Sequence, residues 1–210
     1  GLVPALLHYA GGPRPGTVMT VHNLAFQGQF PRELLASIGL PPHAYGIDGV
    51  EYYGTIGYLK AGLALADRIT TVSPTYAAEI RTPAGGRGLD GLLRHRADVL
   101  TGILNGIDDA LWNPETDAHL VQRYDASHLA RRAANKAALQ ARLGLDVAPS
   151  AFLFGVVSRL TLQKGMDLVA GALPTLMQLG GRLAILGSGD AALEGALKSA
   201  MVNYPGRVGI

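Results

Sequence analysis

The sequence predicts an α/β protein with parallel sheets that are covered on both faces, and three observations support this. Hydrophobic residues make up 48% of the 210 residues and charged residues only 16%, so much of the chain is expected to be buried. Short, nearly continuous apolar runs alternate with segments of helical pattern, as parallel sheets with helices on both faces require. The 28 Gly and 12 Pro residues stay below the share that marks low-complexity chains.

The composition excludes several classes of function. With no Cys, the chain has no disulfide, no thiolate zinc site and no cysteine nucleophile. Its formal net charge is +2, and no run of five like charges occurs, so no nucleic-acid partner is expected. No stretch has the 18 or more mostly apolar residues of a membrane span, so no membrane partner is expected either.

In the first part of the chain, strands and helices are predicted to alternate. The expected strands cover residues 17–21, 68–72 and 99–104. The expected helices cover residues 55–66, a segment opened by Ser73-Pro74, and residues 89–96. Residues 81–88 are rich in Thr, Pro and Gly and predict a loop.

The second part repeats this alternation after a linker at residues 145–150. A helix over 127–143 is closed by Gly144, and the later helices are expected at 166–178 and 191–203. Pro174 should kink or split the first of these two. Strands are expected at 152–157 and 182–186. We therefore predict two α/β domains, residues 1–149 and 150–210.

Ligands of open parallel sheets bind at the carboxyl ends of the strands, so the residues after each strand are the candidate sites. Residues 158–165 follow one strand and lead into a helix opened by Gly165. Arg159 and Lys164, two cations five positions apart beside a helix N-terminus, suit a phosphate. The spacing alone favours the other interpretation, an exposed loop with solvated cations.

Two polar pairs follow strands of the first part. His22-Asn23 could hold sugar hydroxyls or a polar transition state, and a strand-end histidine satisfied by backbone is an equal alternative. Asn105-Gly106 follows the strand at 99–104, and such a dipeptide alone most often marks a turn.

The segment Gly187-Ser188-Gly189-Asp190-Ala191-Ala192 matches the glycine pattern of dinucleotide sites after a strand. The acidic residue that would confirm such a site, about 20 positions further on, does not occur within the sequence. A tight turn between strand and helix is the alternative for Gly187 and Gly189.

Taken in order, five blocks strongly resemble bacterial glycogen synthases and plant starch synthases. The blocks are residues 20–28 (TVHNLAFQG), 59–62 (LKAG), 73–80 (SPTYAAEI), 105–117 (NGIDDALWNPETD) and 158–165 (SRLTLQKG). They fall in the family's order and approximate spacing and extend over nearly the whole chain.

The resemblance implies a fold of the GT-B type, with parts of two Rossmann-like domains and an active site in the cleft between them. It implies a retaining glycosyltransferase that moves glucose from ADP-glucose to the non-reducing end of an α-1,4-glucan. The partners would be a nucleotide sugar and an α-glucan, and no metal or other cofactor is expected. For a bacterial member the resemblance implies a cytoplasmic location.

The same resemblance assigns roles to matching positions. Arg159 and Lys164 would hold the leaving diphosphate, His22 would contact the transferred glucosyl unit, and Asn105 would lie beside it. His22, Arg159 and Lys164 are the predicted catalytic residues. The predicted substrate-binding residues are these three with Asn23, Asn105, Gly106, Gly187 and Gly189.

Two elements of the family are absent from this sequence, a Lys-x-Gly-Gly-Leu loop and a pair of C-terminal glutamates. The chain begins without Met and ends in an apolar run at residues 207–210, so we expect it to be a central fragment. Because the two family elements are missing, we expect this fragment to be inactive by itself. Three alternatives remain open: a related transferase that uses another nucleotide sugar, an NAD-binding domain built on Gly187–Ala192, and a remnant that only binds glucan or has a structural role.

Overall fold

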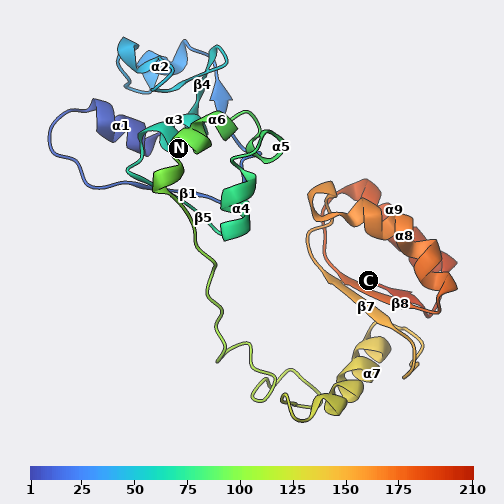
Figure 1. The fold of residues 1–210 in the computed structure, drawn as a ribbon. Coiled ribbons are helices and arrows are strands. Elements are labelled where there is room, and N and C mark those ends of the chain that lie inside the picture. Colours follow the sequence, from blue (N-terminus) through green and yellow to red (C-terminus); the bar gives the residue numbers. More distant parts are fainter. The chain divides into compact units, whose positions relative to one another are not determined.

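The computed structural model describes residues 1–210, and these form two compact units (Figure 1). The first unit is Gly1–Ile107 and the second is Asp108–Ile210. No helix in either unit has both the length and the hydropathy needed to cross a membrane.

A parallel three-stranded sheet forms the centre of the first unit. Its strands are β1 (Val18–Val21), β5 (Arg68–Thr71) and β6 (Leu100–Gly102), in the order β1-β5-β6. All three lie within the predicted segments. The carboxyl ends of the strands share one edge of the sheet, because Val21 pairs with Thr71 and Thr71 pairs with Gly102.

Helices pack on this sheet through apolar side chains. The helical elements of the first unit are α1 (Val3–Tyr9), α2 (Leu34–Ser37), η1 (Pro42–Ala44), α3 (Tyr58–Leu65), α4 (Pro74–Glu79), α5 (Pro83–Gly86), α6 (Asp90–His95) and η2 (Ala97–Val99). Leu63 of α3 and Leu93 of α6 are buried in one cluster with Ile69 of β5. Helix α4 starts as predicted, with the Ser73 hydroxyl accepting from the Tyr76 amide.

A second, antiparallel sheet was not predicted. Its strands are β2 (Gln29–Phe30), β4 (Thr55–Gly57) and β3 (Glu51–Tyr52), in the order β2-β4-β3. The prediction of a helix over 55–66 is therefore wrong for its first three residues, because Ile56 pairs with Phe30 on one side and Glu51 on the other. The predicted loop at 81–88 contains the short helix α5, which Thr82 caps by accepting from the Gly85 amide.

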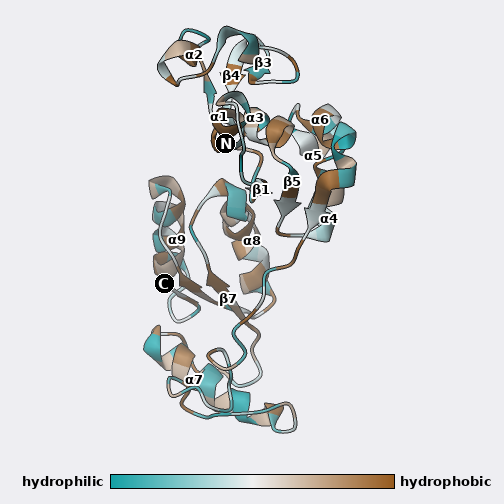
Figure 2. Ribbon diagram, turned by 90° about the vertical axis from the view of Figure 1, so that its left-hand side faces the viewer, coloured by the Kyte–Doolittle hydropathy of each residue, from teal (hydrophilic) through white to brown (hydrophobic).

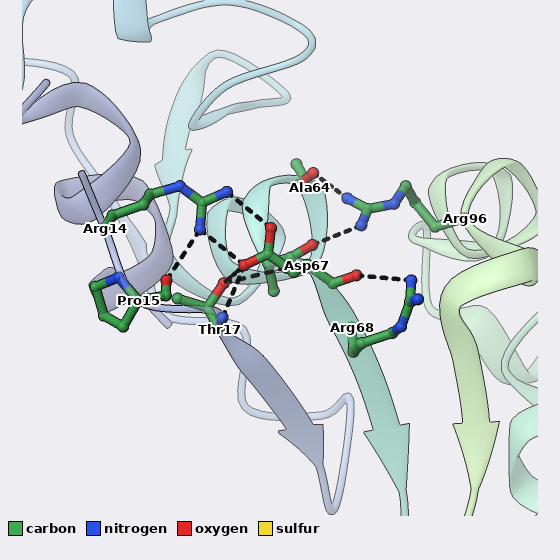
Figure 3. A network of polar contacts seen from close by, with 8 residues as sticks. Arg14, Pro15, Thr17, Ala64, Asp67, Arg68 and Arg96 are labelled. Carbon is green, nitrogen blue, oxygen red and sulfur yellow. Dashed lines mark hydrogen bonds and ion pairs between the residues drawn. The ribbon is translucent and has the colours of Figure 1, made fainter. Parts of the chain in front are cut away.

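A hydrogen-bond network fixes the chain at the start of β5 (Figure 3). The Asp67 carboxylate accepts from both terminal nitrogens of Arg14, at 2.7 and 2.8 Å, and from the amide and hydroxyl of Thr17. The network connects the residues that precede β1 and β5, at the edge of the sheet opposite the carboxyl ends of the strands. We therefore assign it a structural role.

The second unit is built on a parallel sheet of order β7-β8-β9. The strands are β7 (Leu153–Val157), β8 (Arg182–Leu186) and β9 (Val208–Gly209). The helical elements are η3 (Leu129–Arg131), α7 (Arg132–Arg142), η4 (Leu162–Lys164), α8 (Met166–Gln178) and α9 (Ala191–Asn203). Helices α8 and α9 have the predicted bounds, and Pro174 lies inside α8 without splitting it.

Helix α7 belongs to this second unit by its contacts. The Lys136 ammonium donates to the carbonyl of Pro149, and the Asp146 amide donates to the carbonyl of Gly206, close to β9. The compact units therefore divide at 107/108, whereas the predicted domains divide at 149/150. Contacts alone do not test where the family's domains divide, so that boundary stays a prediction.

Coverage of the second sheet is incomplete. Leu183 and Ile185 of β8 are buried with Leu173 of α8 and Leu197 of α9. The neighbours Val157 of β7 and Leu186 of β8, at the carboxyl end of the sheet, are 82% and 69% exposed. Both residues are apolar, and Figure 2 colours β7 as hydrophobic. These two apolar side chains at the carboxyl edge of the sheet are therefore left uncovered by the rest of the chain.

Candidate functional site

Two loops lie together at the carboxyl edge of the β7-β8 sheet. The Leu160 amide donates to the carbonyl of Ser188 at 2.9 Å, and the Asp190 amide donates to the carbonyl of Leu160 at 2.8 Å. Leu160 and Gly189 also form a parallel bridge. The loop that holds Arg159 is therefore attached by its backbone to the glycine loop after β8.

The two glycines of that loop permit this close approach. A Cβ at Gly187 would lie 1.9 Å from the Ser158 carbonyl oxygen, and a Cβ at Gly189 would lie 2.3 Å from that of Leu160. Any larger residue would push the two loops apart. The contacts give Gly187 and Gly189 a structural role, and their substrate contacts stay a prediction.

Arg159 and Lys164 are exposed, and neither side chain has a hydrogen-bond or ion-pair partner in the chain. Lys164 ends the helical turn η4, and Gly165 follows in the left-handed region at φ +69° and begins α8. No side chain caps α8, and the Asp167 and Leu168 amides have no backbone acceptor. This end of α8 thus combines unsatisfied donors, the positive end of the helix dipole and two cations, which suits a phosphate oxygen. The exposed Asp167 carboxylate in its first turn opposes that preference.

The start of α9 is arranged differently. Asp190 caps it, accepting from the amides of Ala192 and Leu193, and the Glu194 carboxylate accepts from the Gly189 amide at 2.8 Å. That last hydrogen bond lowers the pKa of Glu194 below its usual value. The donors that a dinucleotide phosphate would use are therefore occupied by carboxylates of the chain itself, which argues against the NAD alternative.

In the first unit, His22 follows β1 directly and is exposed. Its ring has no hydrogen-bond partner in the chain, so the alternative of a histidine satisfied by backbone is not supported. The next residue, Asn23, is half-buried, and its side-chain oxygen accepts from the Ala25 amide at 2.8 Å. Leu24 anchors the turn because it is fully buried and its amide donates to the Tyr76 hydroxyl. The buried Leu24 thus holds the turn in place, and His22 lies at the surface with both ring nitrogens free of partners in the chain.

Asn105 and Gly106 follow β6 at the same edge of this sheet. Both are exposed and lie in an irregular segment, and Gly106 does not have a positive φ. The tight-turn interpretation of this pair is therefore not supported, and the Asn105 side chain has no partner in the chain.

One polar group at this edge was missed by the sequence reasoning. Thr71, the last residue of the central strand β5, is 1% exposed, and its hydroxyl has no hydrogen-bond partner. It lies in register between Val21, which precedes His22, and Gly102. A threonine that ends a strand carries no pattern in the sequence that would separate it from an ordinary strand residue.

The predicted residues thus form two groups. His22, Asn23, Asn105 and Gly106 share the carboxyl edge of the first sheet, and Arg159, Lys164, Gly187 and Gly189 share that of the second. No cluster of three or more His, Asp or Glu side chains could hold a metal ion in either unit.

Comparisons with known proteins add independent information. Residues 1–95 match the sequence profile of the starch synthase catalytic domain. The chain is 60% identical over 210 residues to a glycogen synthase of Rhodopseudomonas palustris strain BisB18, and 62% identical over 209 residues to one of Methylocella silvestris. Each alignment covers 100% of this chain and 43% of the relative. The chain therefore spans less than half the length of these relatives.

A solved structure agrees with the sequence comparisons. The catalytic domain of starch synthase IV from Arabidopsis thaliana, bound to ADP and acarbose, matches with a TM-score of 0.81 and 34% identity. The match covers 91% of this chain and 40% of that one. The predicted α/β class with parallel sheets of the GT-B type is thereby confirmed.

Proposed function

Because the chain belongs to the family of glycogen synthases and starch synthases, we propose that it forms part of a retaining glycosyltransferase. The enzyme moves glucose from ADP-glucose to the non-reducing end of an α-1,4-glucan. The observation that carries the proposal is the contrast between two helix starts in the second unit. Helix α8 is uncapped beside the unpaired cations Arg159 and Lys164, whereas α9 is closed by Asp190 and Glu194.

The chemistry of glycosyl transfer explains why two cations are needed. As the bond between glucose and the diphosphate breaks, positive charge develops on the sugar and negative charge on the leaving group. Arg159 and Lys164 stabilise the departing diphosphate more strongly than the intact donor, so they lower the barrier rather than only increase affinity. In this proposal the two side chains supply the positive charge that stabilises the diphosphate, and no metal ion is needed for that role.

His22 and Asn105 act on the sugar in this proposal. The free imidazole of His22 donates or accepts a hydrogen bond at a hydroxyl of the transferred glucosyl unit, and Asn105 contacts the same unit from the end of β6. Asn23 and Gly106 line the same edge.

The choice of donor and acceptor is part of the proposal. The starch synthase IV catalytic domain was solved with ADP and acarbose, which supports an adenine nucleotide and a glucan-like ligand for this chain as well. A diphosphate is common to ADP-glucose and UDP-glucose, so the two cations alone do not select between them.

The test measures glucose incorporation into glycogen by the full-length protein that carries residues 1–210. With ADP-glucose as donor, Arg159→Ala and Lys164→Ala should each lower kcat about 100- to 1000-fold, as loss of one donor to a transition-state charge does. Glycogen binding should change little. UDP-glucose, tested in parallel, should support much slower transfer.

A matched control is Arg142→Ala, which removes an exposed cation of the same unit at the end of α7. It should retain wild-type turnover. Wild-type turnover in Arg159→Ala and Lys164→Ala would contradict the assigned roles, and saturable NADH binding without glucosyl transfer would favour the dinucleotide alternative.

A further inference from the structure

The turn that follows β1 is held in place by few hydrogen bonds. Residues 22–25 lie outside the helices and strands, and no backbone carbonyl accepts from their amides. The Ala25 amide donates to the side chain of Asn23 within the turn, whereas the Leu24 amide donates to the hydroxyl of Tyr76 at 3.1 Å. Tyr76 belongs to α4 and lies 52 positions further along the chain. Its hydroxyl is therefore the group from outside the turn that fixes the backbone of the turn.

The first turn of α4 fixes the position of Tyr76. The Ser73 hydroxyl accepts from the Tyr76 amide at 3.2 Å, and Pro74 occupies the start of the helix. Gly102, the last residue of β6, lies directly against this turn. A Cβ on Gly102 would stand 2.4 Å from the Ser73 carbonyl oxygen and 2.5 Å from the Cα of Pro74. The start of α4 is thus held against the carboxyl edge of the sheet.

The ring of Tyr76 is fixed by apolar packing. It is half-buried and packs against the core cluster that contains Val21, Leu24 and Ile80. The hydroxyl at the end of this ring meets the amide of Leu24, whose side chain is fully buried in the same cluster. Replacing Tyr76 by phenylalanine would therefore remove this hydrogen bond and keep the packing of the ring.

The hydrogen bond matters for His22, which lies two positions before Leu24. The His22 ring is exposed and has no hydrogen-bond partner in the chain, so no side-chain contact of that kind fixes it. Its place depends on the backbone of the turn. Because group transfer requires close alignment of the reacting groups, a displacement of about 1 Å can lower the rate about 100-fold.

We propose that Tyr76 is a positioning residue for glucosyl transfer. Its hydroxyl holds the Leu24 amide, and through it the turn that presents His22 to the transferred sugar, without touching the substrate itself. The part of this inference that concerns the reaction rests on the role of His22 in the proposed function.

The same helix start also supports the second predicted sugar contact. Gly102 precedes Asn105 by three positions, and the Ile103 amide donates to the carbonyl of Thr71 at 2.7 Å. The close approach of Gly102 to Ser73 therefore sets where the chain leaves the sheet toward Asn105. Helix α4 thus supports both predicted sugar contacts from a position outside the site.

The first test is Tyr76→Phe in the full-length protein that carries residues 1–210. The kcat for glucose incorporation into glycogen should fall about tenfold, because the turn loses one of its two hydrogen bonds and His22 is less well aligned. The KM for ADP-glucose should change less than about twofold, because the proposed diphosphate contacts come from the second unit. Hydrogen exchange of the amides of residues 22–25, measured by mass spectrometry, should become about tenfold faster.

A double-mutant cycle with His22 separates positioning from direct action. In a His22→Ala background, Tyr76→Phe should lower kcat less than about twofold further, because the group that it positions is already absent. The Tyr76 hydroxyl keeps one proton that it could donate to a substrate. A further loss of about tenfold in the His22→Ala background would show that Tyr76 acts on the substrate itself, and it would overturn the positioning role.

Thr17→Val is the control for a loss of stability. The Thr17 hydroxyl exchanges hydrogen bonds with Asp67 at the opposite edge of the same sheet. Its removal should lower the melting temperature, as Tyr76→Phe does, and leave kcat and the exchange of residues 22–25 unchanged. An equal loss of kcat in Thr17→Val and Tyr76→Phe would show that reduced stability explains both, and it would overturn the inference.

The same measurements separate this inference from the proposed function. Glucose transfer by the wild type with an unchanged kcat in Tyr76→Phe would overturn only the positioning role. A full-length protein that transfers no glucose would overturn the proposed function, whereas faster exchange at residues 22–25 in its Tyr76→Phe variant would still support the attachment of the His22 turn to Tyr76. Unchanged exchange in Tyr76→Phe would overturn the inference in either case.

Discussion

Gly189 lies against the backbone of Leu160 so closely that a Cβ on the glycine would stand 2.3 Å from the Leu160 carbonyl oxygen. Leu160 is next to Arg159, so this contact sets the position of the loop that carries one of the two proposed phosphate-binding cations. A rigid support matters because a charge stabilises a transition state only when it is already in place.

Gly189→Ala should therefore displace the Arg159 loop. We expect a loss of about 1–3 kcal/mol in the free energy of unfolding, as for other overpacked sites, together with a lower kcat in the full-length protein. Chemical denaturation and glucose incorporation into glycogen measure the two effects.

Gly195→Ala is the matched control in the same unit. This glycine lies within α9, and a methyl group added to it would have no neighbouring atom within 4 Å. Alanine should therefore raise stability by about 0.5–1 kcal/mol and leave turnover unchanged. Equal behaviour of the two variants would refute the special role of the Gly189 contact.

A second prediction concerns His22. Because its ring is exposed and makes no hydrogen bond within the chain, His22→Ala should leave the melting temperature nearly unchanged. Turnover of the full-length protein should fall about 100-fold or more, since a donor or acceptor to the reacting sugar is lost. The exposed His119 serves as control, and His119→Ala should be neutral in both measurements. A lower melting temperature of His22→Ala with normal turnover would show that His22 has only a structural role.

Local signals were sufficient for much of the second unit. The apolar run at Arg182–Leu186 locates β8, and the helical pattern at residues 191–203 locates α9; both agree with the structure. The bounds of α8 also agree, because Gly165 and the apolar periodicity identify it even with Pro174 inside. These elements are determined by residues close together in the sequence.

Elements that depend on distant partners could not be predicted in this way. Ile56 lies in a strand only because Phe30 and Glu51 flank it, and its own neighbours suggest a helix. The turn at Tyr53-Gly54 lacks the usual asparagine, and a cavity beside it joins residues 47–53 to residues 88–95. The candidate residues His22 and Arg159 were found because each closely follows a strand. Thr71 and Lys60 stand out only because they are polar and buried, which the sequence does not show.

A third prediction is a pH dependence of stability at Asp67. The hydrogen bonds from Arg14, and then those from Thr17, hold the pKa of the Asp67 carboxyl well below its usual value of 3.8. A lowered pKa in the folded state stabilises the protein above the unfolded pKa, and this stabilisation is lost as the pH falls toward the folded pKa. The melting temperature should therefore fall as the pH drops below about 4, and Asp67→Asn should lower it at pH 7 and flatten that acid dependence.

Asp98→Asn is the control for this pH series. Asp98 is exposed in the same unit and its side chain has no partner, so its variant should follow the wild-type curve. If Asp67→Asn keeps the full acid dependence of the wild type, other carboxylates are responsible for it.

The last prediction concerns the 210-residue chain by itself. It spans 43% of the length of its glycogen synthase relatives, and the Lys-x-Gly-Gly-Leu loop and paired glutamates of the family do not occur in it. Positioning of both substrates contributes about 7–11 kcal/mol to such reactions, and a partial set of contacts forfeits much of this. Purified residues 1–210 should therefore incorporate no glucose into glycogen from ADP-glucose above a protein-free control, while the full-length protein does. Incorporation by the 210-residue chain that disappears in Arg159→Ala would show that the essential groups all lie within it.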